Sequence, residues 1–425
     1  MLPALDSPSL VVIAGVFLAY AALSRRLHGT SLTAPMVFVA AGFALGLEGL
    51  GWLHLTLSQE SVRALAEATL VVVLFTDASR IDLRALRREY SVPARLLGVG
   101  LPLTIVAGTL AAGIVLHNVM WAEAAVLAIV LAPTDAALGQ AVVTDENLPS
   151  RIRQGLNVES GLNDGLCVPL LTIALAIAQT DAGDISASHA VRLVVEAIGW
   201  GIAGGVIAGG VAAWALRAAR ARGWTEGHWA QVVPVIGAVG AFGIADARGG
   251  SGFIAAFVGG VAYGRIVRPD AVAAAFSEEL GGVLNGVTLI VFGAAVVGGF
   301  WSQIGVAEVV YGILSLTIVR MVPVAIAMLG SHARAPTVLF LGWFGPRGLA
   351  SIVFGVVVVE AAELPHTSEL MIALTVTVAL SVFAHGASAA PLARRYAAWY
   401  AVSGGPMESA PAPRQRWRHA LHVTR

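Results

Sequence analysis

Three carboxylates lie close together in a strongly apolar part of the chain. Asp135 follows Pro133 and Thr134 inside one hydrophobic stretch, and Glu159 and Asp164 stand near the start of the next. An acidic side chain at the centre of a membrane costs roughly 2.5–3.5 kcal/mol on insertion scales, so three of them indicate a function. Carboxylate, hydroxyl and amide oxygens suit a hard cation, and a carboxylate can trade that cation for a proton. The pattern predicts a proton-coupled cation transporter.

Asp164 is the carboxylate that we expect to exchange its ligand. Ser160 and Asn163 bring a hydroxyl and an amide within about one helical turn of it. A proton and a cation compete for one carboxylate, and this competition would couple their movements. The alternative is a structural carboxylate, held in a salt bridge or capping a broken helix.

Thr134 and Asp135 are predicted to lie at a break in a helix. Pro133 removes regular helical hydrogen bonds and leaves carbonyl oxygens available to an ion. Two roles are open for Asp135: a ligand of the cation, or a charge that offsets the positive end of a half-helix. Thr134 is a candidate ligand, although a threonine hydroxyl also bonds readily to its own helix.

Glu159 is predicted to be structural, because two arginines fall within apolar segments and need compensation. Arg320 is its first expected partner, and Arg347 is the alternative. Asp77, near the end of another apolar segment, has two open roles. It lines the access funnel of the ion, or it faces the basic stretch 80–95.

The composition is that of a polytopic membrane protein. Of the 425 residues, 57% are hydrophobic and 12% are charged, whereas soluble domains carry about 25% charged residues. Apolar runs long enough to span about 30 Å of hydrocarbon recur throughout. We expect an all-α fold of thirteen transmembrane helices, near 8–24, 32–50, 61–78, 92–116, 121–144, 154–178, 190–216, 230–246, 251–266, 279–300, 304–329, 336–360 and 368–391.

The arginines predict the topology of these helices. All 26 basic residues are arginine, and basic short loops mark the cytoplasmic side of a membrane protein. With the N-terminus outside, only Arg63, Arg192 and Arg248 fall in outer loops. The expected location is the cell (inner) membrane, with a cytoplasmic C-terminus.

The expected domain organisation is simple. A transmembrane domain covers 1–402, its core helices include 121–178 and 304–391, and a short basic cytoplasmic tail covers 403–425. Pro133 interrupts one helix and Gly345-Pro346-Arg347-Gly348 interrupts another, seven helices later. The two interrupted helices therefore cross the membrane in opposite directions. Paired interruptions of this kind indicate inverted repeats with two crossing discontinuous helices.

Other classes of function find little support. A P-loop needs a lysine, and the chain has none. An intramembrane enzyme needs a nucleophile beside a base, and Ser160 next to Glu159 is the one candidate. His385 falls in a helix and is expected to pack there. We expect no enzyme activity, no cofactor and no nucleic-acid partner.

Taken together, several motifs resemble the NhaP-like sodium/proton antiporters of the monovalent cation/proton antiporter superfamily. They are Thr134-Asp135, the segment from Glu159 to Gly165, Arg320, and Gly345-Pro346-Arg347-Gly348. The resemblance extends over essentially the whole chain. It implies a core domain with two crossing broken helices that moves against a dimerisation domain, and hence a homodimer in the lipid bilayer.

The resemblance also implies roles for individual residues. Asp164 would carry the ion and the proton, and Thr134, Asp135 and Ser160 would help to ligate the monovalent cation. Glu159 would pair with Arg320. One departure concerns the residue after Asp135, which is usually proline in this family and is Ala136 here. The proline precedes the pair instead, so the break stays adjacent and we still expect the two broken helices to cross.

Asn163 bears on the stoichiometry. Family members with Asp-Asp at this position resemble electrogenic exchangers, and those with Asn-Asp resemble electroneutral ones. Asn163 cannot release a proton, so Asp164 alone would exchange one proton for one cation. We expect electroneutral 1:1 antiport of Na⁺ or Li⁺ for H⁺, with a role in pH homeostasis. A K⁺/H⁺ antiporter stays open, because selectivity depends on cavity size and dehydration, and so does a cation channel.

Overall fold

The structure is a computed structural model that describes residues 7–27, 30–55, 60–81, 91–135, 137–183, 185–267, 271–361 and 364–409. Every regular element in these ranges is a helix, as the sequence predicts. The chain divides into two compact units. Unit 1 comprises Met1–Glu67, Ser91–Ser160 and Leu284–Pro411, and unit 2 comprises Ala68–Tyr90, Gly161–Val283 and Ala412–Arg425.

Three helices contain the boundaries between the units, namely α3 (Glu60–Ser79), α9 (Ser150–Asp181) and α13 (Ala271–Val291). Unit 2 also holds α10 (Ala187–Ala221), α11 (Gly227–Asp246) and α12 (Gly252–Ile266). The other helices belong to unit 1: α1 (Ser7–Leu27), α2 (Ala34–Leu45), α5 (Ser91–Arg95), η1 (Leu96–Gly100), α6 (Leu101–Val115), α7 (Trp121–Val130), α8 (Gln140–Val143), η2 (Phe292–Val297), α14 (Gly298–Phe300), η3 (Trp301–Gln303), α15 (Val306–Leu316), α16 (Ile318–Ala327), α17 (Ala335–Trp343), α18 (Leu349–Ala361), α19 (Thr367–Ser403) and α20 (Pro406–Ser409).

The helices have the lengths and compositions of membrane spans. Within the described ranges, eight helices are long and apolar enough to cross a membrane, and four further apolar helices are shorter. Two of the shorter ones, α7 and α18, are halves of interrupted helices. The exact number of spans therefore stays a prediction.

Helix α7 stops at Val130, just before Pro133, and regular helix resumes only at Gln140. Helix α17 begins with Pro336 in its first turn, stops at Trp343, and is followed by α18 from Leu349. Proline lacks an N–H and clashes with the preceding turn, so each interruption follows from the sequence.

A third interruption was not predicted. We expected one helix over 304–329, and Val306–Ala327 forms one apolar helix long enough to cross a membrane, but Thr317 divides it into α15 and α16. Thr317 has φ −109° and ψ −94°, outside the helical region, while its hydroxyl bonds back to Ile313 O at 2.6 Å. No glycine or proline stands at this position. The start of the next helix lies only a few residues before Arg320.

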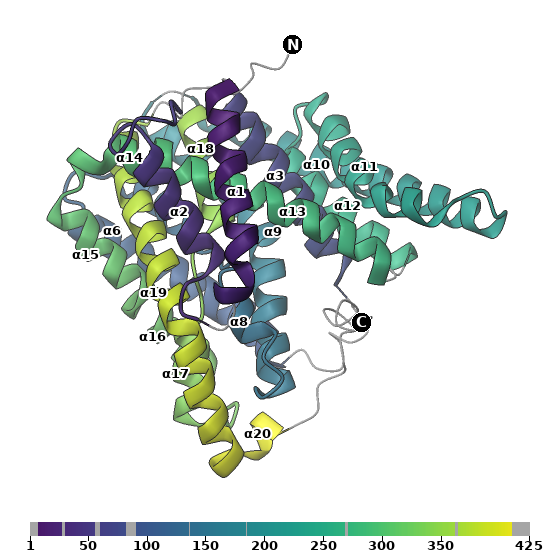
Figure 1. The fold of residues 1–425 in the computed structure, drawn as a ribbon. Helices are drawn as coiled ribbons and strands as arrows, with labels where there is room; N and C mark the ends of the chain where they lie inside the picture. Colours follow the sequence, from purple (N-terminus) through teal and green to yellow (C-terminus); the bar gives the residue numbers. More distant parts are fainter. Residues whose placement is uncertain are drawn as a thin grey trace. The chain divides into compact units, whose positions relative to one another are not determined.

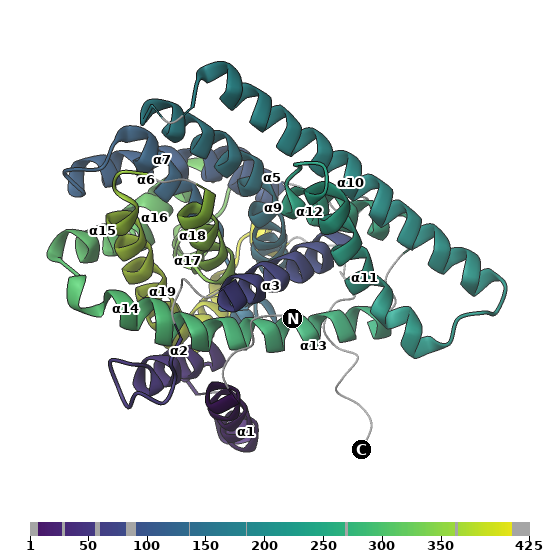
Figure 2. The same ribbon diagram turned by 90° about the horizontal axis from the view of Figure 1, so that it is seen from above.

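In unit 2, small residues let three helices pack closely. Ala208 of α10, Ala241 and Ala245 of α11, and Ala255 of α12 form one buried cluster. Figure 2 shows α10, α11 and α12 side by side. Phe75 of α3 packs against Tyr263 of α12, with ring centroids 5.7 Å apart.

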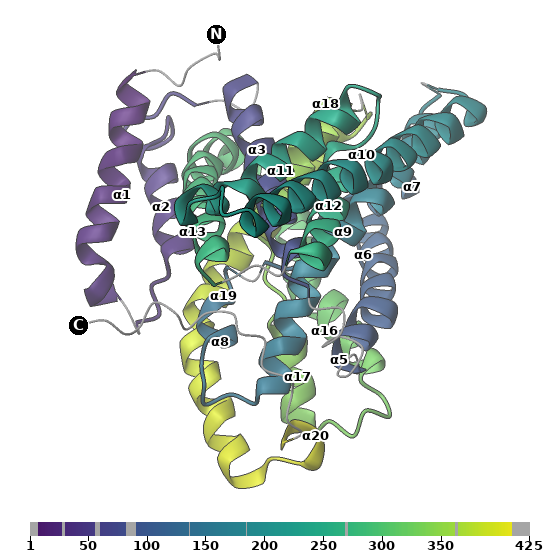
Figure 3. The same ribbon diagram turned by 90° about the vertical axis from the view of Figure 1, so that its right-hand side faces the viewer.

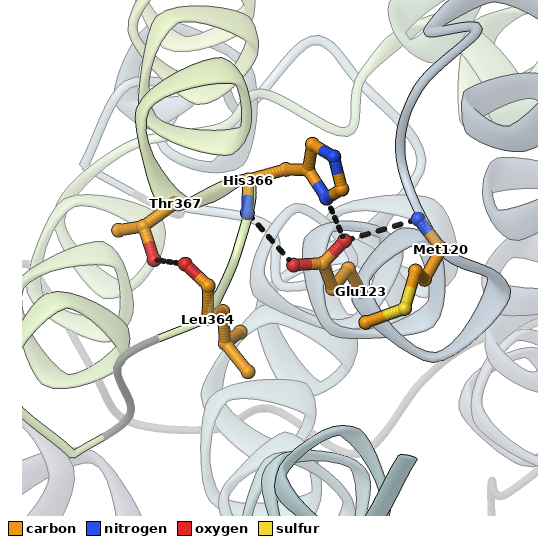
Figure 4. Close-up of polar contacts among 5 residues, drawn as sticks. All are labelled: Met120, Glu123, Leu364, His366 and Thr367. Carbon is orange, nitrogen blue, oxygen red and sulfur yellow. Dashed lines mark hydrogen bonds and ion pairs between the residues drawn. The ribbon is translucent and has the colours of Figure 1, made fainter. Parts of the chain in front are cut away.

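In unit 1, one buried carboxylate joins the start of α7 to the start of α19 (Figure 4). Glu123 is fully buried and accepts hydrogen bonds from Met120 N at 3.0 Å and from His366 N at 3.0 Å. His366 Nδ1 lies 2.8 Å from the same carboxylate. Because the first N–H groups of a helix lack partners within the helix, Glu123 satisfies donors at the ends of two helices at once.

A second buried carboxylate that accepts hydrogen bonds at a helix start lies just after the end of α19. Helix α19 runs past α17 and ends beside α20 (Figures 1 and 3). Glu408 of α20 is 1% exposed. It accepts hydrogen bonds from Arg334 N at 3.0 Å, Thr337 Oγ1 at 2.7 Å and Gly405 N at 3.1 Å. The start of α17 is therefore capped by a residue that follows α19.

The tail that we expected from residue 403 thus begins as packed structure. Met407 is buried, and its carbonyl accepts a hydrogen bond from Arg151 at 3.3 Å. Residues 410–425, with the remaining tail arginines, lie outside the described residues, as do Arg84, Arg87, Arg88 and Arg268 of the expected cytoplasmic loops.

Replacing Glu408 with glutamine should destabilise this end of α17. The amide keeps one acceptor oxygen, so a buried donor loses its partner, and we expect a loss of about 1–3 kcal/mol at pH 7. Burial alone would raise the pKa of Glu408, but hydrogen bonds from Arg334, Thr337 and Gly405 outweigh it and lower that pKa. The stabilisation is therefore present at neutral pH and is lost as the pH falls through the lowered pKa.

Thermal unfolding of the purified protein in detergent, repeated at decreasing pH, measures both effects. Glu308→Gln is the matched control, because Glu308 caps only its own helix, by accepting a hydrogen bond from Gly305 N. Identical melting of Glu408→Gln and the unchanged protein at pH 7 would contradict the capping role.

Candidate functional site

Arg347 lies at the carboxyl-terminal end of the half-helix α7. It is fully buried, and its Nη1 donates to Ala132 O at 2.9 Å and to Pro133 O at 3.3 Å. These carbonyls follow α7, where the helix ends and its last acceptors lack helical partners. The guanidinium therefore satisfies the carbonyls and offsets the negative end of the helix dipole.

Asp135 caps the start of α18 with a negative charge. Its Oδ2 accepts a hydrogen bond from Leu349 N at 3.0 Å, and its Oδ1 accepts one from Ala137 N at 2.7 Å. The carboxylate thus lies at the positive end of the half-helix α18. Of the two roles open for Asp135, compensation of a helix end is the one that this geometry directly supports. Ala136 lies outside the described residues.

The segment between α7 and α8 is the first interruption, and the segment between α17 and α18 is the second. These two interruptions also bond to each other through the backbone. Asp135 N donates to Pro346 O at 2.7 Å. The approach is close enough that a side chain at Gly348 would place its Cβ 2.1 Å from Asp135 Oδ2. Only glycine therefore fits at position 348, which explains this residue in the Gly-Pro-Arg-Gly motif.

Helix α9 meets the first interruption at Ser160. This hydroxyl is buried and donates to Thr134 O. Thr134 is buried as well and lies outside any helix. The structure therefore brings Thr134, Asp135 and Ser160 together within unit 1, and their role as cation ligands stays a prediction.

Glu159 and Arg320 form a buried ion pair. Arg320 Nη1 lies 2.6 Å from Glu159 Oε1, and both side chains are 2% exposed. Arg320 passes directly against the second interruption, since a Cβ at Gly345 would lie 2.5 Å from its Nε. Of the two partners considered for Glu159, the structure places Arg320 beside it, whereas Arg347 contacts the end of α7.

Asn163 and Asp164 lie in unit 2, one turn further along α9. Asn163 is 1% exposed and Asp164 is half-buried. Asp77 of α3 lies beside this turn, because a Cβ at Gly161 would be 3.8 Å from its Cβ. Gly165 packs on α12, where a Cβ would be 2.1 Å from the ring of Phe257. Asp164 thus stands next to Gly165, whose lack of a side chain lets α12 approach closely.

Ser381 and His385 of α19 are the polar residues that sequence reasoning did not assign to the site. Arg347 N donates to Ser381 Oγ at 2.6 Å, and His385 Nε2 lies 2.9 Å from Trp343 O. Packing was the expected role of His385. The available signal was weak: a serine and a histidine four residues apart on one face of an apolar helix.

The donors around the interruptions are oxygen atoms, which suit a hard cation. Within the described ranges, no three His, Cys, Asp or Glu residues form a group that could hold a metal ion. The oxygens gathered around the interruptions come from a carboxylate, hydroxyls and backbone carbonyls, which are the ligands of hard cations.

Comparison with known proteins identifies the family. The model of the transmembrane sodium/hydrogen exchangers matches residues 13–395. The chain belongs to the sodium/hydrogen exchanger family. Members of the sodium/hydrogen exchanger family are membrane transporters and not enzymes, in agreement with the sequence prediction.

Curated relatives of this exchanger are distant. The K(+)/H(+) antiporter NhaP2 of Shewanella oneidensis is 24% identical over 230 residues, which are 54% of this chain and 39% of that protein. NhaP2 of Shewanella sp. (strain MR-4) is 24% identical over 262 residues, which are 61% of this chain and 44% of that protein. The matched region spans about two-fifths of the length of these relatives.

The exchanger also matches a solved structure. The sodium proton antiporter MjNhaP1 from Methanocaldococcus jannaschii, at pH 8, matches with a TM-score of 0.74 and 16% identity, over 91% of this chain and 97% of that one. A second structure of MjNhaP1 gives a TM-score of 0.70. At this level of identity the likeness shows the fold, and the predicted antiporter fold is confirmed.

Removing Glu159 should lower the stability of this exchanger more than it changes cation affinity. Glu159→Ala leaves Arg320 buried without its counter-charge, which typically costs about 3–5 kcal/mol. Thermal unfolding in detergent measures the loss, and cation-dependent stabilisation of the same sample measures binding. The matched control is Glu196→Ala, which breaks an exposed ion pair with Arg192 worth at most about 1 kcal/mol.

The double variant Glu159→Leu with Arg320→Met removes both charges together. It should melt closer to the unchanged protein than Glu159→Ala does, because no buried charge is left unpaired. A Glu159→Ala protein with unchanged melting and lost cation binding would instead make Glu159 a ligand.

Proposed function

We propose that this protein is a secondary active antiporter that exchanges a monovalent cation, Na⁺ or Li⁺, for H⁺ by competition at Asp164. The observation that carries the proposal is how the other two carboxylates are held. Glu159 is in an ion pair with Arg320, and both oxygens of Asp135 accept backbone N–H groups. Asp164, which is half-buried one turn after Ser160 on α9, is the carboxylate to which we assign the exchange.

The position of Asp164 on α9 supports the proposal. Ser160 precedes it by four residues, so the hydroxyl and the carboxylate lie on one face of the helix, one turn apart. Asp164 is half-buried, which suits a group that is alternately exposed to water and shielded from it. Asn163, beside it, adds a neutral amide oxygen without a second charge.

Further oxygens are proposed to assist in ligating the cation. Thr134 and Ser160 contact each other through the Thr134 carbonyl, and each keeps lone pairs that a cation can use. Asp135 contributes its negative charge while it caps α18. Asp77, beside Gly161, is proposed to line the access funnel.

The same arrangement supports electroneutral exchange. Asn163 does not titrate, Glu159 is compensated by Arg320, and a proton on Asp135 would compete with two backbone donors. One proton on Asp164 would then be exchanged for one monovalent cation, with no net charge moved. The cycle would depend on the concentration gradients of the two ions and not on the membrane potential.

Potassium is the second candidate cation. The curated relatives are named K(+)/H(+) antiporters, whereas the solved structure with the same fold is a sodium proton antiporter. Selectivity depends on cavity size and on the cost of dehydration. Flux assays with Na⁺, Li⁺ and K⁺ in turn distinguish the candidates.

The cellular setting follows the sequence-based expectations. We propose a homodimer in the cell (inner) membrane, with the N-terminus outside and the C-terminus in the cytoplasm, that works by alternating access in pH homeostasis. In unit 1, Arg151 bonds to Met407 O and the backbone N–H of Arg334 bonds to Glu408, both in the segment that follows α19. These two arginines therefore lie at the same end of unit 1, and the distribution of arginines predicts that this end is cytoplasmic.

Asp164→Asn should abolish exchange while the protein still folds. Asparagine keeps the shape of the side chain but holds no exchangeable proton, so we expect at least a hundredfold loss of cation-driven proton flux, by order of magnitude. Flux is measured in vesicles with a pH-sensitive dye after addition of Na⁺, Li⁺ or K⁺.

Asp181→Asn is the matched control, because Asp181 is the exposed last residue of the same helix. It should retain full flux. Normal exchange by the folded Asp164→Asn protein would refute the assignment, whatever cation drives it.

A further inference from the structure

We propose that Ser381 and His385 of α19 are positioning residues, which hold the interruption between α17 and α18 in the geometry that the ion site needs. The inference rests on the proposed function, since it concerns the same site. It assigns His385 a role as a neutral hydrogen-bonding bridge and not as a carrier of protons.

The interruption leaves backbone groups that α19 satisfies. Trp343 O, at the end of α17, lies 2.9 Å from His385 Nε2, and Arg347 N, just before α18, donates to Ser381 Oγ at 2.6 Å. Ser381 is fully buried and His385 is 1% exposed. A buried N–H or C=O without a partner is costly, so these two bonds determine where the interruption can lie.

One arrangement of protons in these contacts keeps the ring neutral. A carbonyl oxygen can only accept, so His385 Nε2 must donate to Trp343 O. In the neutral ring, Nδ1 then accepts, and the Ser381 hydroxyl at 3.1 Å is its donor. The hydroxyl oxygen in turn accepts from Arg347 N. The chain of donors runs from Arg347 N through Ser381 and His385 to Trp343 O, and the neutral tautomer satisfies every member.

A doubly protonated ring would disturb this chain. Nδ1 would have to donate, with Ser381 O at 3.0 Å as its acceptor, and the Ser381 hydroxyl would lose its acceptor on the ring. The charged groups that act on His385 are Arg347 and Arg320. Both are permanently cationic, so neither exchanges a proton with the ring.

Further contacts fix the same segment. Trp343 Nε1 donates to Ser388 Oγ at 2.9 Å, and the rings of Trp343 and His385 lie 5.0 Å apart. The segment so held carries Arg347, which satisfies Ala132 O, and Leu349, whose N–H binds Asp135. A shift of the interruption would therefore move the groups that position Asp135 and Thr134. Small displacements of a binding group are costly for function.

The test compares four variants with the unchanged protein. His385→Gln keeps one donor and one acceptor, His385→Leu removes both at similar volume, and Ser381→Ala removes the hydroxyl. Thr375→Val is the matched control, because Thr375 is buried on the same helix and its hydroxyl donates to Met371 O of that helix. Each protein is reconstituted in vesicles for flux assays across a range of pH, with Na⁺, or with K⁺ if only K⁺ drives the unchanged protein.

His385→Leu and Ser381→Ala should each raise the apparent KM for the cation about tenfold, the effect expected from one lost buried hydrogen bond. His385→Gln should stay within about twofold, with an unchanged pH profile, and Thr375→Val should match the unchanged protein. A Gln variant as impaired as the Leu variant, or with a shifted pH profile, would overturn the proposal. A normal KM in both His385→Leu and Ser381→Ala would do so as well.

A binding assay separates this inference from the proposed function. Cation-dependent thermal stabilisation in detergent requires no transport. If Asp164→Asn still exchanges ions, the proposed function fails, and the His385 series is then judged by this assay alone. Stabilisation that is weakened in His385→Leu and Ser381→Ala but kept in His385→Gln supports the positioning role. Equal stabilisation in all of them contradicts it.

Discussion

The structure depends on the need to satisfy helix ends that lie inside a membrane protein. Two interrupted helices each expose carbonyl or N–H groups where water cannot replace a lost partner. Each interrupted helix supplies the side chain that satisfies the helix end of the other. Arg347, from the second interruption, satisfies the carbonyls that follow α7, and Asp135, from the first, caps the start of α18. Each interruption therefore depends on the other, and neither could take this form alone.

This mutual compensation limits which groups are available for chemistry. Asp135 and Arg347 are held at helix ends, and Glu159 is paired with Arg320. We propose that the half-buried carboxylate of Asp164 exchanges the proton. Helix α19 supports the arrangement along its length. It is joined to the start of α7 through Glu123, to the second interruption through His385, and to the start of α17 through Tyr396, whose hydroxyl lies 2.9 Å from Thr337 Oγ1.

The sequence predicted the parts of this arrangement that depend on composition and on single strong signals. Proline and glycine located both interruptions, and the burial cost of charge pointed to Glu159 and Arg320 as partners. The sequence did not predict the break at Thr317, because no helix-breaking residue stands there. Nor did it predict the roles of His385, Glu123 and Glu408. Those roles depend on contacts between residues distant in the chain, and in sequence such residues look like ordinary packing or helix-end groups.

The dependence of exchange on membrane potential tests the central claim most directly. If only Asp164 changes its protonation, the cycle moves no net charge. Cation-driven proton flux in vesicles should then be the same with and without an inside-negative potential of about 100 mV, set by a gradient of a permeant anion so that K⁺ can also be tested. One net charge per cycle would feel about 2.3 kcal/mol at that potential. A rate that rises several-fold would contradict the account, and would indicate that a second carboxylate, such as Asp135, also exchanges its proton.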